Sequence, residues 1–421
     1  MSNSICIFED SGYSNLLPLV YFRPPCDLLN GILTLREKIT HYIPSDSVTV
    51  HTRKYLEKFV QKENPDIHVN KLDDNSESCL FINGRVVADK TLAEILISSP
   101  DNTLFVSGDD VVAAKVSGEN LVKFKNGLPE LFSVADFDNL NKKEVEAVVV
   151  AYPWNLVLRN GEEITKDFEE LVDRNSEMIN GKIYDNVTFV NKENIYIAEG
   201  AKIKPGAVLD AEEGPIYIAK GATVMANAVI EGPCYVGEKS KIKILAKIYE
   251  GTSIGPVCKV GGEVEESIIH SYSNKQHDGF LGHAYLGQWV NLGADTNNSD
   301  LKNNYGNVKV IINDGEPIDS GSLFVGLTMG DHSKTSINTM INTGTVVGVS
   351  TNIFGNGFPD KYVPSFGWGG SDSMTTYNIE KSMSVAKKVM ARRDKSFTEV
   401  EEEVFRKVYE LTQPERDKRN M

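Results

Sequence analysis

The chain has 421 residues, 41% of them hydrophobic, and a formal net charge of −15. This length predicts at least two domains. The negative charge argues against a general role at nucleic acids or membrane surfaces, and no apolar run is long enough to span a bilayer. We expect no signal peptide, because the N-terminus has acidic residues and no basic stretch. The five scattered cysteines favour a reducing cytoplasm over a disulfide scaffold.

Predicted strands and helices alternate over residues 1–150. Apolar strands are expected at 4–8, 48–51, 80–82 and 103–107, and helices at 33–42 and 91–98. This alternation predicts an α/β domain with a parallel, doubly wound sheet. Residues 151–180 follow as a linker, with a helix expected over 162–174.

The second half of the chain places an aliphatic residue at every sixth position. Chance does not explain eight successive hits, because only about half of an ordinary sequence is apolar. Neither the helical period of 3.6 nor the strand period of 2 gives this spacing. A coil with three short faces per turn gives it, so residues 181–370 are predicted to form a parallel β-helix of hexapeptide repeats. The eight positions are Ile218, Val224, Ile230, Val236, Ile242, Ile248, Ile254 and Val260.

The ladder continues on both sides with changes of phase. Upstream members are Ile197, Ile203 and Leu209, and the expected downstream members are Phe280, Leu286, Leu292, Val325, Asp331, Ile337, Thr343 and Val349. The spacing fails at 267–279 and 297–322, and there we expect the substrate. The asparagine-rich segment 291–306 is expected to form a loop that leaves the coil.

Residues 371–421 form a helical extension, with helices predicted over 378–393 and 398–411. Thr398 and Glu401 have the spacing of a capping box. We expect these helices to cap the open end of the coil or to pack on a neighbour, because an uncovered end would be an exposed sheet edge.

Three of the seven histidines fall near the first failure of the ladder, at positions 270, 277 and 283. Regular coil turns do not need histidine, whereas a neutral imidazole near pH 7 can accept a proton during catalysis. A zinc site is disfavoured, because the histidine spacings fit no common zinc pattern.

A resemblance to a known family begins at these residues. The run His277-Asp-Gly-Phe-Leu-Gly-His-Ala-Tyr-Leu-Gly-Gln-Trp-Val-Asn-Leu-Gly-Ala-Asp-Thr is similar to the acyltransferase segment of the bifunctional bacterial enzymes that make UDP-N-acetylglucosamine. It also resembles archaeal sugar-1-phosphate nucleotidylyltransferases. The start of the chain, Asn15-Leu-Leu-Pro-Leu-Val-Tyr-Phe-Arg-Pro, looks like a sugar nucleotidyltransferase subgroup. The resemblance implies a nucleotidyltransferase-like α/β domain followed by a left-handed β-helix.

The resemblance also implies roles for individual residues of the coil. His277 would be the general base, Asn291 would contact the sugar, and Lys309 would approach the sugar phosphate. Acetyl-CoA would lie along the coil at a subunit boundary, since such coils associate as homotrimers. His270, His283 and His332 are expected to be structural. The chain departs from the family at Asp295, where glycine is more usual, and in the run that ends at His332.

The N-terminal domain departs further from the family. Its first strand leads into Ile7-Phe-Glu-Asp-Ser-Gly-Tyr, which keeps only Gly12 of the usual glycine-rich phosphate loop. Arg23 could supply positive charge for a phosphate instead, or serve structurally at the sheet edge. The resemblance places Asp109 at a magnesium-binding position, and the alternative is a turn or helix cap.

Three functions remain open from the sequence. The first is acyl transfer from acetyl-CoA to an amino-sugar 1-phosphate. The second is nucleotidylyl transfer, which joins a sugar 1-phosphate to a nucleoside triphosphate with Mg²⁺ while the coil holds the trimer together. The third is a nucleotide sensor on a structural coil, without catalysis.

Overall fold

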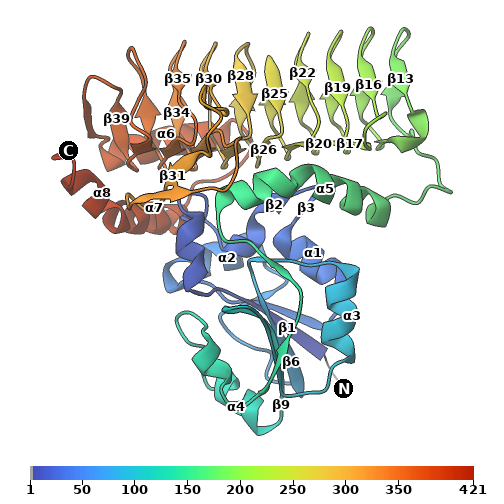
Figure 1. Ribbon diagram of the computed structural model, residues 1–421, viewed down its shortest axis with the longest axis vertical. Helices are drawn as coiled ribbons and strands as arrows, with labels where there is room; N and C mark the ends of the chain where they lie inside the picture. The colour runs from blue at the N-terminus through green and yellow to red at the C-terminus, as the bar shows by residue number, and fades with distance from the viewer. Residues whose placement is uncertain (1–2) are drawn as a thin grey trace.

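The computed structural model describes residues 3–421, so residues 1–2 of the expected N-terminal domain lie outside the described part. Residues 182–376 wind into a coil of mainly parallel strands, which runs along the top of Figure 1. The aliphatic ladder forms its interior, and each of the eight residues from Ile218 to Val260 is at most 1% exposed. Ile218, Val236 and Ile254 face one another on neighbouring strands. The predicted left-handed parallel β-helix is confirmed.

Three sheets form the faces of the coil. The first sheet contains β12 (Lys182–Ile183), β15 (Lys202–Ile203), β18 (Thr223–Val224), β21 (Lys241–Ile242), β24 (Lys259–Val260), β27 (Asn274–Lys275), β34 (Lys334–Thr335), β37 (Asn352–Ile353), β39 (Gly367–Gly369) and β40 (Met374–Thr376). The second contains β13 (Thr188–Val190), β16 (Val208–Asp210), β19 (Val229–Glu231), β22 (Lys247–Ile248), β25 (Glu263–Glu265), β28 (Phe280–Gly282), β30 (Asn297–Asn298) and β35 (Met340–Ile341). The third contains β14 (Ile195–Ile197), β17 (Ile216–Ile218), β20 (Cys234–Val236), β23 (Thr252–Ile254), β26 (Ile268–Ile269), β29 (Tyr285–Leu286), β33 (Thr328–Met329), β36 (Val346–Val347) and β38 (Tyr362–Val363).

The later part of the ladder needs correction. Leu286 and Leu292 lie in the coil interior as predicted, but Leu281 takes the inner position expected for Phe280. In the last turns the inward residues are Met329, Thr335, Ile341, Val347 and Ile353. The expected series is wrong, since Ile337 is 67% exposed and Asp331 bonds to Arg23. Both series have a six-residue spacing, and the one with fewer polar members is buried.

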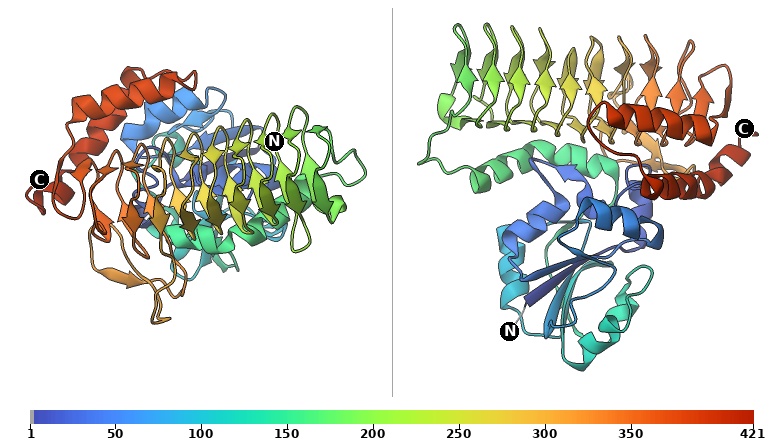
Figure 2. Two further views of the ribbon diagram at one scale, coloured as in Figure 1. Left: turned by 90° about the horizontal axis from the view of Figure 1, so that it is seen from above. Right: turned by 180° about the vertical axis from the view of Figure 1, so that it is seen from behind.

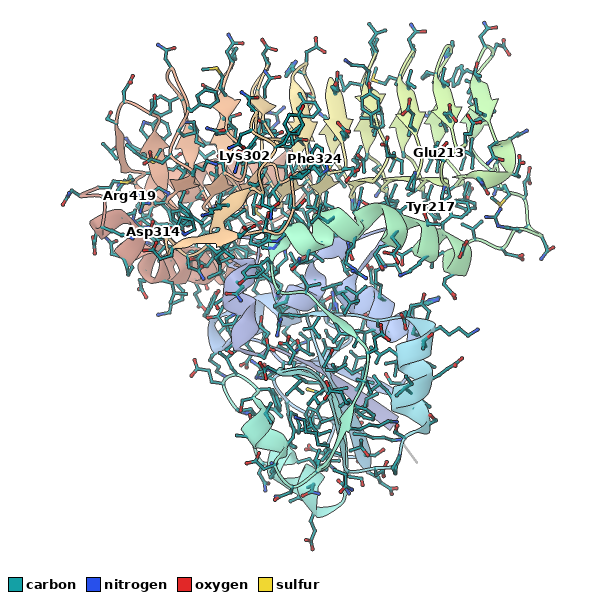
Figure 3. The ribbon with its side chains drawn as sticks, viewed as in Figure 1. Glu213, Tyr217, Lys302, Asp314, Phe324 and Arg419 are labelled. Atoms are coloured by element: carbon teal, nitrogen blue, oxygen red, sulfur yellow. The ribbon has the colours of Figure 1, made fainter. Side chains whose placement is uncertain are left out.

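The two interruptions differ in structure. Lys275 takes a ladder position in the first, opposite Val260, and its ammonium donates to the carbonyls of Gly261 (2.9 Å) and His277 (2.8 Å). The chain therefore stays in the coil there. In the second, the chain remains in the coil through β30 and then leaves it for a hairpin of β31 (Lys309–Ile311) and β32 (Pro317–Asp319). Near the hairpin turn, Asp314 pairs with Arg419 at 2.6 Å, and Figure 3 shows these two residues close together at one end of the molecule.

The N-terminal domain lies below the coil in Figure 1. Its sheet has the order β10-β8-β9-β6-β1-β4-β5. The expectation of a wholly parallel sheet is wrong, because β9 runs antiparallel to both of its neighbours. The strands are β1 (Asn3–Phe8), β4 (Ser47–Val50), β5 (His68–Val69), β6 (Ser78–Asn83), β8 (Thr103–Ser107), β9 (Asp110–Ser117) and β10 (Asn141–Glu144), with short pairs β2 (Leu29–Asn30)–β3 (Leu33–Thr34) and β7 (Val86–Val87)–β11 (Val148–Val149). The helices are α1 (Leu35–Tyr42), α2 (Glu57–Glu63), α3 (Lys90–Ser98) and α4 (Glu119–Lys125), and the short 3-10 turns of the chain are η1 (Ser11–Leu16), η2 (Pro25–Asp27), η3 (Lys54–Leu56), η4 (Val134–Phe137) and η5 (Lys192–Asn194).

Helix α5 (Pro153–Leu171) lies between the N-terminal domain and the third sheet of the coil (Figure 1). Its buried Asn160 joins the two: the side chain accepts from the Gly31 amide at 2.8 Å and donates to the Gly251 carbonyl at 2.8 Å. The Tyr285 hydroxyl of the coil donates to the Leu29 carbonyl at 3.0 Å. A buried polar group that loses its partner costs about 1–3 kcal/mol, so these contacts fix the domain on the coil.

Three helices follow the coil: α6 (Ile379–Ala391), α7 (Glu399–Leu411) and α8 (Gln413–Asp417). The predicted capping box of Thr398 and Glu401 is present at the start of α7. Figure 2, from behind, shows α6 lying across the last turns of the coil. Its buried residues include Met383 and Ala386, which pack with Val349 and Phe366 of the coil. None of the helices formed by residues 3–421 is long and apolar enough to cross a membrane.

Candidate active site on the coil

A cavity of about 190 Å³ lies between the first sheet and the end of α6. Its floor comes from outward-facing residues of successive turns, which stand in register along the sheet: Lys259, Asn274, Asn291 and Lys334. Arg392 and Arg393 line it from the helix side. We call this cavity the cationic pocket. The register of the strands explains why these side chains gather, because residues at equivalent positions of stacked turns form a straight column.

The charges of the cationic pocket are not balanced by acids. Four cations and no carboxylate line it. Burial lowers the pKa of Lys334 to about 8. Burial also lowers the pKa of Lys259, and the neighbouring charges of Arg393, Lys241, Arg392 and Lys243 add to that effect. Crowded cations are stabilised by an anion, so this pocket suits a phosphate or carboxylate.

Amide and aromatic side chains complete the pocket. Arg393 donates to Asn274 Oδ1 at 3.3 Å, and Asn274 Nδ2 donates to Asn291 Oδ1 at 3.4 Å. Tyr272 and Trp289 stack with their ring centroids 4.3 Å apart. Amides can bond hydroxyl groups and an aromatic face can pack on a sugar ring, so the lining suits a phosphorylated, hydroxyl-bearing molecule.

His277 is exposed and lies next to Gln276, which lines the cationic pocket. The ammonium of buried Lys275 holds its backbone through the His277 carbonyl. The structure thus places His277 and Asn291 on the same part of the coil. Lys309 is not brought to them: it lies on the hairpin, whose apolar residues pack against Trp154 and the third sheet.

The other three histidines of the coil are buried and have structural contacts. Burial lowers the pKa of His270 to about 3, and the Nε2 atom of that ring lies 2.9 Å from the Asp27 carbonyl. His332 stacks on Trp289 with ring centroids 6.0 Å apart, and burial lowers its pKa. His283 lies between Asp300 (2.9 Å) and Glu266 (3.1 Å). Burial lowers the pKa of His283, but the hydrogen bonds to these two carboxylates outweigh burial and raise it to about 9.

Arg23 is 4% exposed and its charge is used within the protein. One guanidinium nitrogen donates to the Leu19 carbonyl at 2.6 Å and to Asp331 Oδ1 at 3.0 Å, and the other donates to Asp331 Oδ2. This buried pair joins the N-terminal domain to the coil. It matches the structural alternative for Arg23.

The carboxyl ends of β1 and β6 meet where a nucleotide would bind in an open α/β sheet. Arg85 occupies this point, pairing with Asp10 and Asp110 at 2.6 Å each. Its guanidinium carbon lies 2.4 Å from where a Cβ on Gly12 would be. Side chains of the protein therefore fill the position of the missing glycine-rich loop.

A resident magnesium ion does not fit this end of the sheet. Asp109 is exposed on the turn between β8 and β9, and the adjacent Asp110 is bound to Arg85. Among residues 3–421, no group of three or more His, Cys, Asp or Glu side chains is arranged to hold a metal ion. Mg²⁺ needs octahedral oxygen ligands, and only the Asp109 carboxylate is unengaged here.

Comparisons with known proteins agree with this architecture. The family model described as "Sugar nucleotidyl transferase" matches residues 5–176. A bifunctional sugar-1-phosphate nucleotidylyltransferase/acetyltransferase of Sulfurisphaera tokodaii is 30% identical over 328 residues, which cover 63% of this chain and 80% of that protein.

The chain belongs to the family of bifunctional sugar-1-phosphate nucleotidylyltransferase/acetyltransferases. The matched family and relative are both named as transferases. The match to bacterial members is shorter: the bifunctional protein GlmU of Rippkaea orientalis is 29% identical over 134 residues, which cover 31% of this chain and 27% of that protein. The chain thus spans about a quarter of that relative's length. A solved Francisella novicida UDP-N-acetylglucosamine acyltransferase is 16% identical, with 52% of this chain and 71% of that chain covered at a TM-score of 0.25.

The four cations of the cationic pocket are not among the candidate residues identified from the sequence. They are Lys259, Lys334, Arg392 and Arg393. The sequence contains a pattern that indicates the lysines of the first sheet. A lysine stands directly before the ladder residue on β12, β15, β21 and β24, which puts a row of lysines on the outside of the first sheet. No such signal reveals the arginines of α6, because their position depends on where that helix packs.

Proposed function

We propose that this protein transfers an acetyl group from acetyl-CoA to the amine of an amino-sugar 1-phosphate. The cationic pocket carries the proposal, because four cations converge beside Asn291 without a carboxylate. In this role Lys259, Lys334, Arg392 and Arg393 hold the phosphate, and Asn291 bonds a sugar hydroxyl. The family name supports an acetyltransferase activity in a relative with the same layout.

His277 is the proposed general base. As the amine nitrogen forms its bond to the thioester carbonyl carbon, the imidazole accepts the amine proton, and the carbon–sulfur bond then breaks to release CoA. The exposed corner of the coil beside Gln276 leaves room for the donor. Lys275 keeps this corner in place by its bond to the His277 carbonyl.

The test is release of CoA thiol from acetyl-CoA and glucosamine 1-phosphate, and the protein adds little background because its five cysteines are buried. His277→Ala should lower kcat by about 10²–10⁴-fold, and Lys334→Ala should raise KM for the sugar phosphate. Lys202→Ala, on the same sheet but outside the pocket, is the matched control. Wild-type rates in both pocket variants would refute the proposal.

The second candidate is nucleotidylyl transfer by the N-terminal domain, supported by the family match over residues 5–176. It predicts pyrophosphate release from UTP or dTTP, given as magnesium salts, with a sugar 1-phosphate. Asp109→Asn should lose that release, while Asp101→Asn, on a different exposed turn, should keep it. The Arg85 pairs at the strand ends make this the weaker candidate.

We also propose that the enzyme acts in the cytoplasm as a homotrimer. All five cysteines are unpaired and buried, which fits a reducing compartment. The second sheet faces the viewer in Figure 1, on a side of the coil that α5 does not cover, and supplies the free face for association.

A further inference from the structure

A second and larger cavity lies on the same side of α6 as the cationic pocket. Its volume is about 640 Å³, within the range of small-molecule sites. Trp368 and Tyr377 line it from the coil, and Lys381, Val385 and Lys388 line it from the helix. We call it the aromatic pocket. None of the residues assigned above to acetyl transfer lines it.

The two pockets follow one another along the same face of α6 and the same row of the first sheet, and we call this stretch the groove. On the helix, Lys381, Val385, Lys388 and Arg392 follow the i, i+4, i+7, i+11 spacing of a single face. On the sheet, Trp368, Asn352, Lys334 and Asn291 stand opposite one another on consecutive strands. Neighbouring strands are about 4.8 Å apart, so Trp368 and Lys334 are separated by about 10 Å along the groove.

The aromatic pocket offers a ring surface that a monomeric core does not require. Trp368 is 42% exposed and Phe354 is 39% exposed. Their ring centroids are 5.3 Å apart, and Tyr377 lies 4.7 Å from Trp368 on a tilted plane. Exposed aromatic faces of this kind stack on nucleobases, with about 1–3 kcal/mol for each stacked base.

The charges along the helix side lack partners in the protein. Among residues 3–421, no carboxylate forms an ion pair with Lys381, Lys388 or Arg392. Glu380 is the one acid that lines the aromatic pocket, and it is paired with Arg406 at 2.7 Å. In a chain with a net charge of −15, this is a local excess of positive charge next to an aromatic surface.

We infer that the groove binds a nucleoside diphosphate group, with its base on Trp368 and its phosphates between Lys388 and Lys334. The diphosphate would span the distance from the aromatic pocket toward the cationic pocket. Either a nucleotide sugar or the ADP part of CoA carries this group. The inference goes beyond the proposed function, because the groove can hold a nucleotide whether or not an acetyl group is transferred.

Binding of ADP, UDP, CoA and inorganic pyrophosphate to the full-length protein tests the inference by calorimetry, together with quenching of Trp368 fluorescence. The other two tryptophans, Trp154 and Trp289, are 3% and 6% exposed, and Trp289 lines the cationic pocket, so the quenching that is lost in Trp368→Ala is the part that reports on Trp368. The nucleotides should bind at least tenfold more tightly than pyrophosphate. Tightest binding of CoA would identify a CoA ligand, and tightest binding of UDP a nucleotide sugar.

Substitutions distinguish binding in the groove from general effects on the fold. Trp368→Ala and Lys388→Ala should each weaken ADP binding by about tenfold, whereas Trp368→Tyr keeps a stacking ring and should retain binding. Lys387→Ala is the matched control, because Lys387 lines a different cavity on the other side of α6. The inference is wrong if nucleotides bind no better than pyrophosphate, or if the alanine variants bind like the wild type.

These outcomes are independent of the test for acyl transfer. Nucleotide binding without CoA release would refute the proposed function and leave the groove as assigned. CoA release with an unchanged KM for acetyl-CoA and unchanged ADP binding in Trp368→Ala would support acyl transfer and refute the nucleotide site.

Discussion

Two sets of cations in this protein differ in their partners. Arg23, Arg53 and Arg85 each bond to a carboxylate of the same chain. Lys259 and Lys334 instead gather with two arginines beside a cavity. The first group stabilises the fold, and the second is available to a ligand.

Anion binding at the cationic pocket should depend on pH through Lys334. A bound anion favours the protonated amine, and the pKa of Lys334 is about 8 in the absence of ligand. Affinity for glucosamine 1-phosphate should therefore fall about tenfold as the pH rises from 7.5 to 9.5, where the phosphate itself stays fully ionised. Lys334→Arg should remove this dependence, since guanidinium does not titrate in this range. Equal slopes for both proteins would contradict the assignment.

The Arg23–Asp331 pair should matter for stability and little for substrate. Arg23→Met leaves the Asp331 carboxylate buried without a cation, with only the Gln288 amide still bonded to it, which costs about 3–5 kcal/mol. Arg23→Met combined with Asp331→Leu should recover most of that loss, because no charge is left buried. Urea unfolding of both variants measures the loss of stability and its recovery. If Arg23→Met unfolds like the wild type and instead loses nucleotide binding, the phosphate role expected for this arginine would be restored.

Among the elements, the segment that leaves the coil after β30 is tied down by His283. Its imidazolium bonds Asp300 of that segment and Glu266 of the preceding turn. Because the pKa of His283 is raised from 6.5 to about 9, its contribution to stability is complete below pH 6.5 and is lost as the pH rises through 9.

His283→Gln should therefore destabilise the protein by about 2 kcal/mol at pH 6.5 and by much less at pH 10. Thermal unfolding across this range measures the difference. His41→Gln, at a half-exposed helix residue, is the control. A stability difference between His283→Gln and the wild type that does not change with pH would contradict a charged His283.

The strands of the coil could be predicted from sequence because an aliphatic residue recurs at each interior position. The residues from Ile218 to Val260 admit one register only. The last turns contain two series of residues with six-residue spacing, and both include polar residues. Which series faces the interior depends on Arg23, because its bond to Asp331 keeps that residue out of the interior. Of the candidate site, Asn291 and His277 could be found from motif resemblance. The cations of α6 could not, because helix packing and not local spacing brings them to the coil.

At the scale of the whole molecule, the N-terminal domain and the C-terminal helices cover two faces of the coil. The domain and α5 cover much of the third sheet, and α6 covers the end of the first (Figures 1 and 2). Neither covers the second sheet.

Light scattering should give three times the 46.5 kDa mass of the chain if the homotrimer forms through this sheet. Val229→Glu, at a half-buried outward position of the second sheet, should dissociate it, whereas Thr223→Glu on the first sheet should not. A mass of 46.5 kDa for the wild type at micromolar concentration would contradict association.

The placement of α6 has a consequence for how copies work together. The end of α6 and the first sheet of the same chain line the cationic pocket. We therefore expect each copy of the chain to bind the sugar phosphate by itself. Mixing active with inactive copies should then dilute the activity in direct proportion to their number.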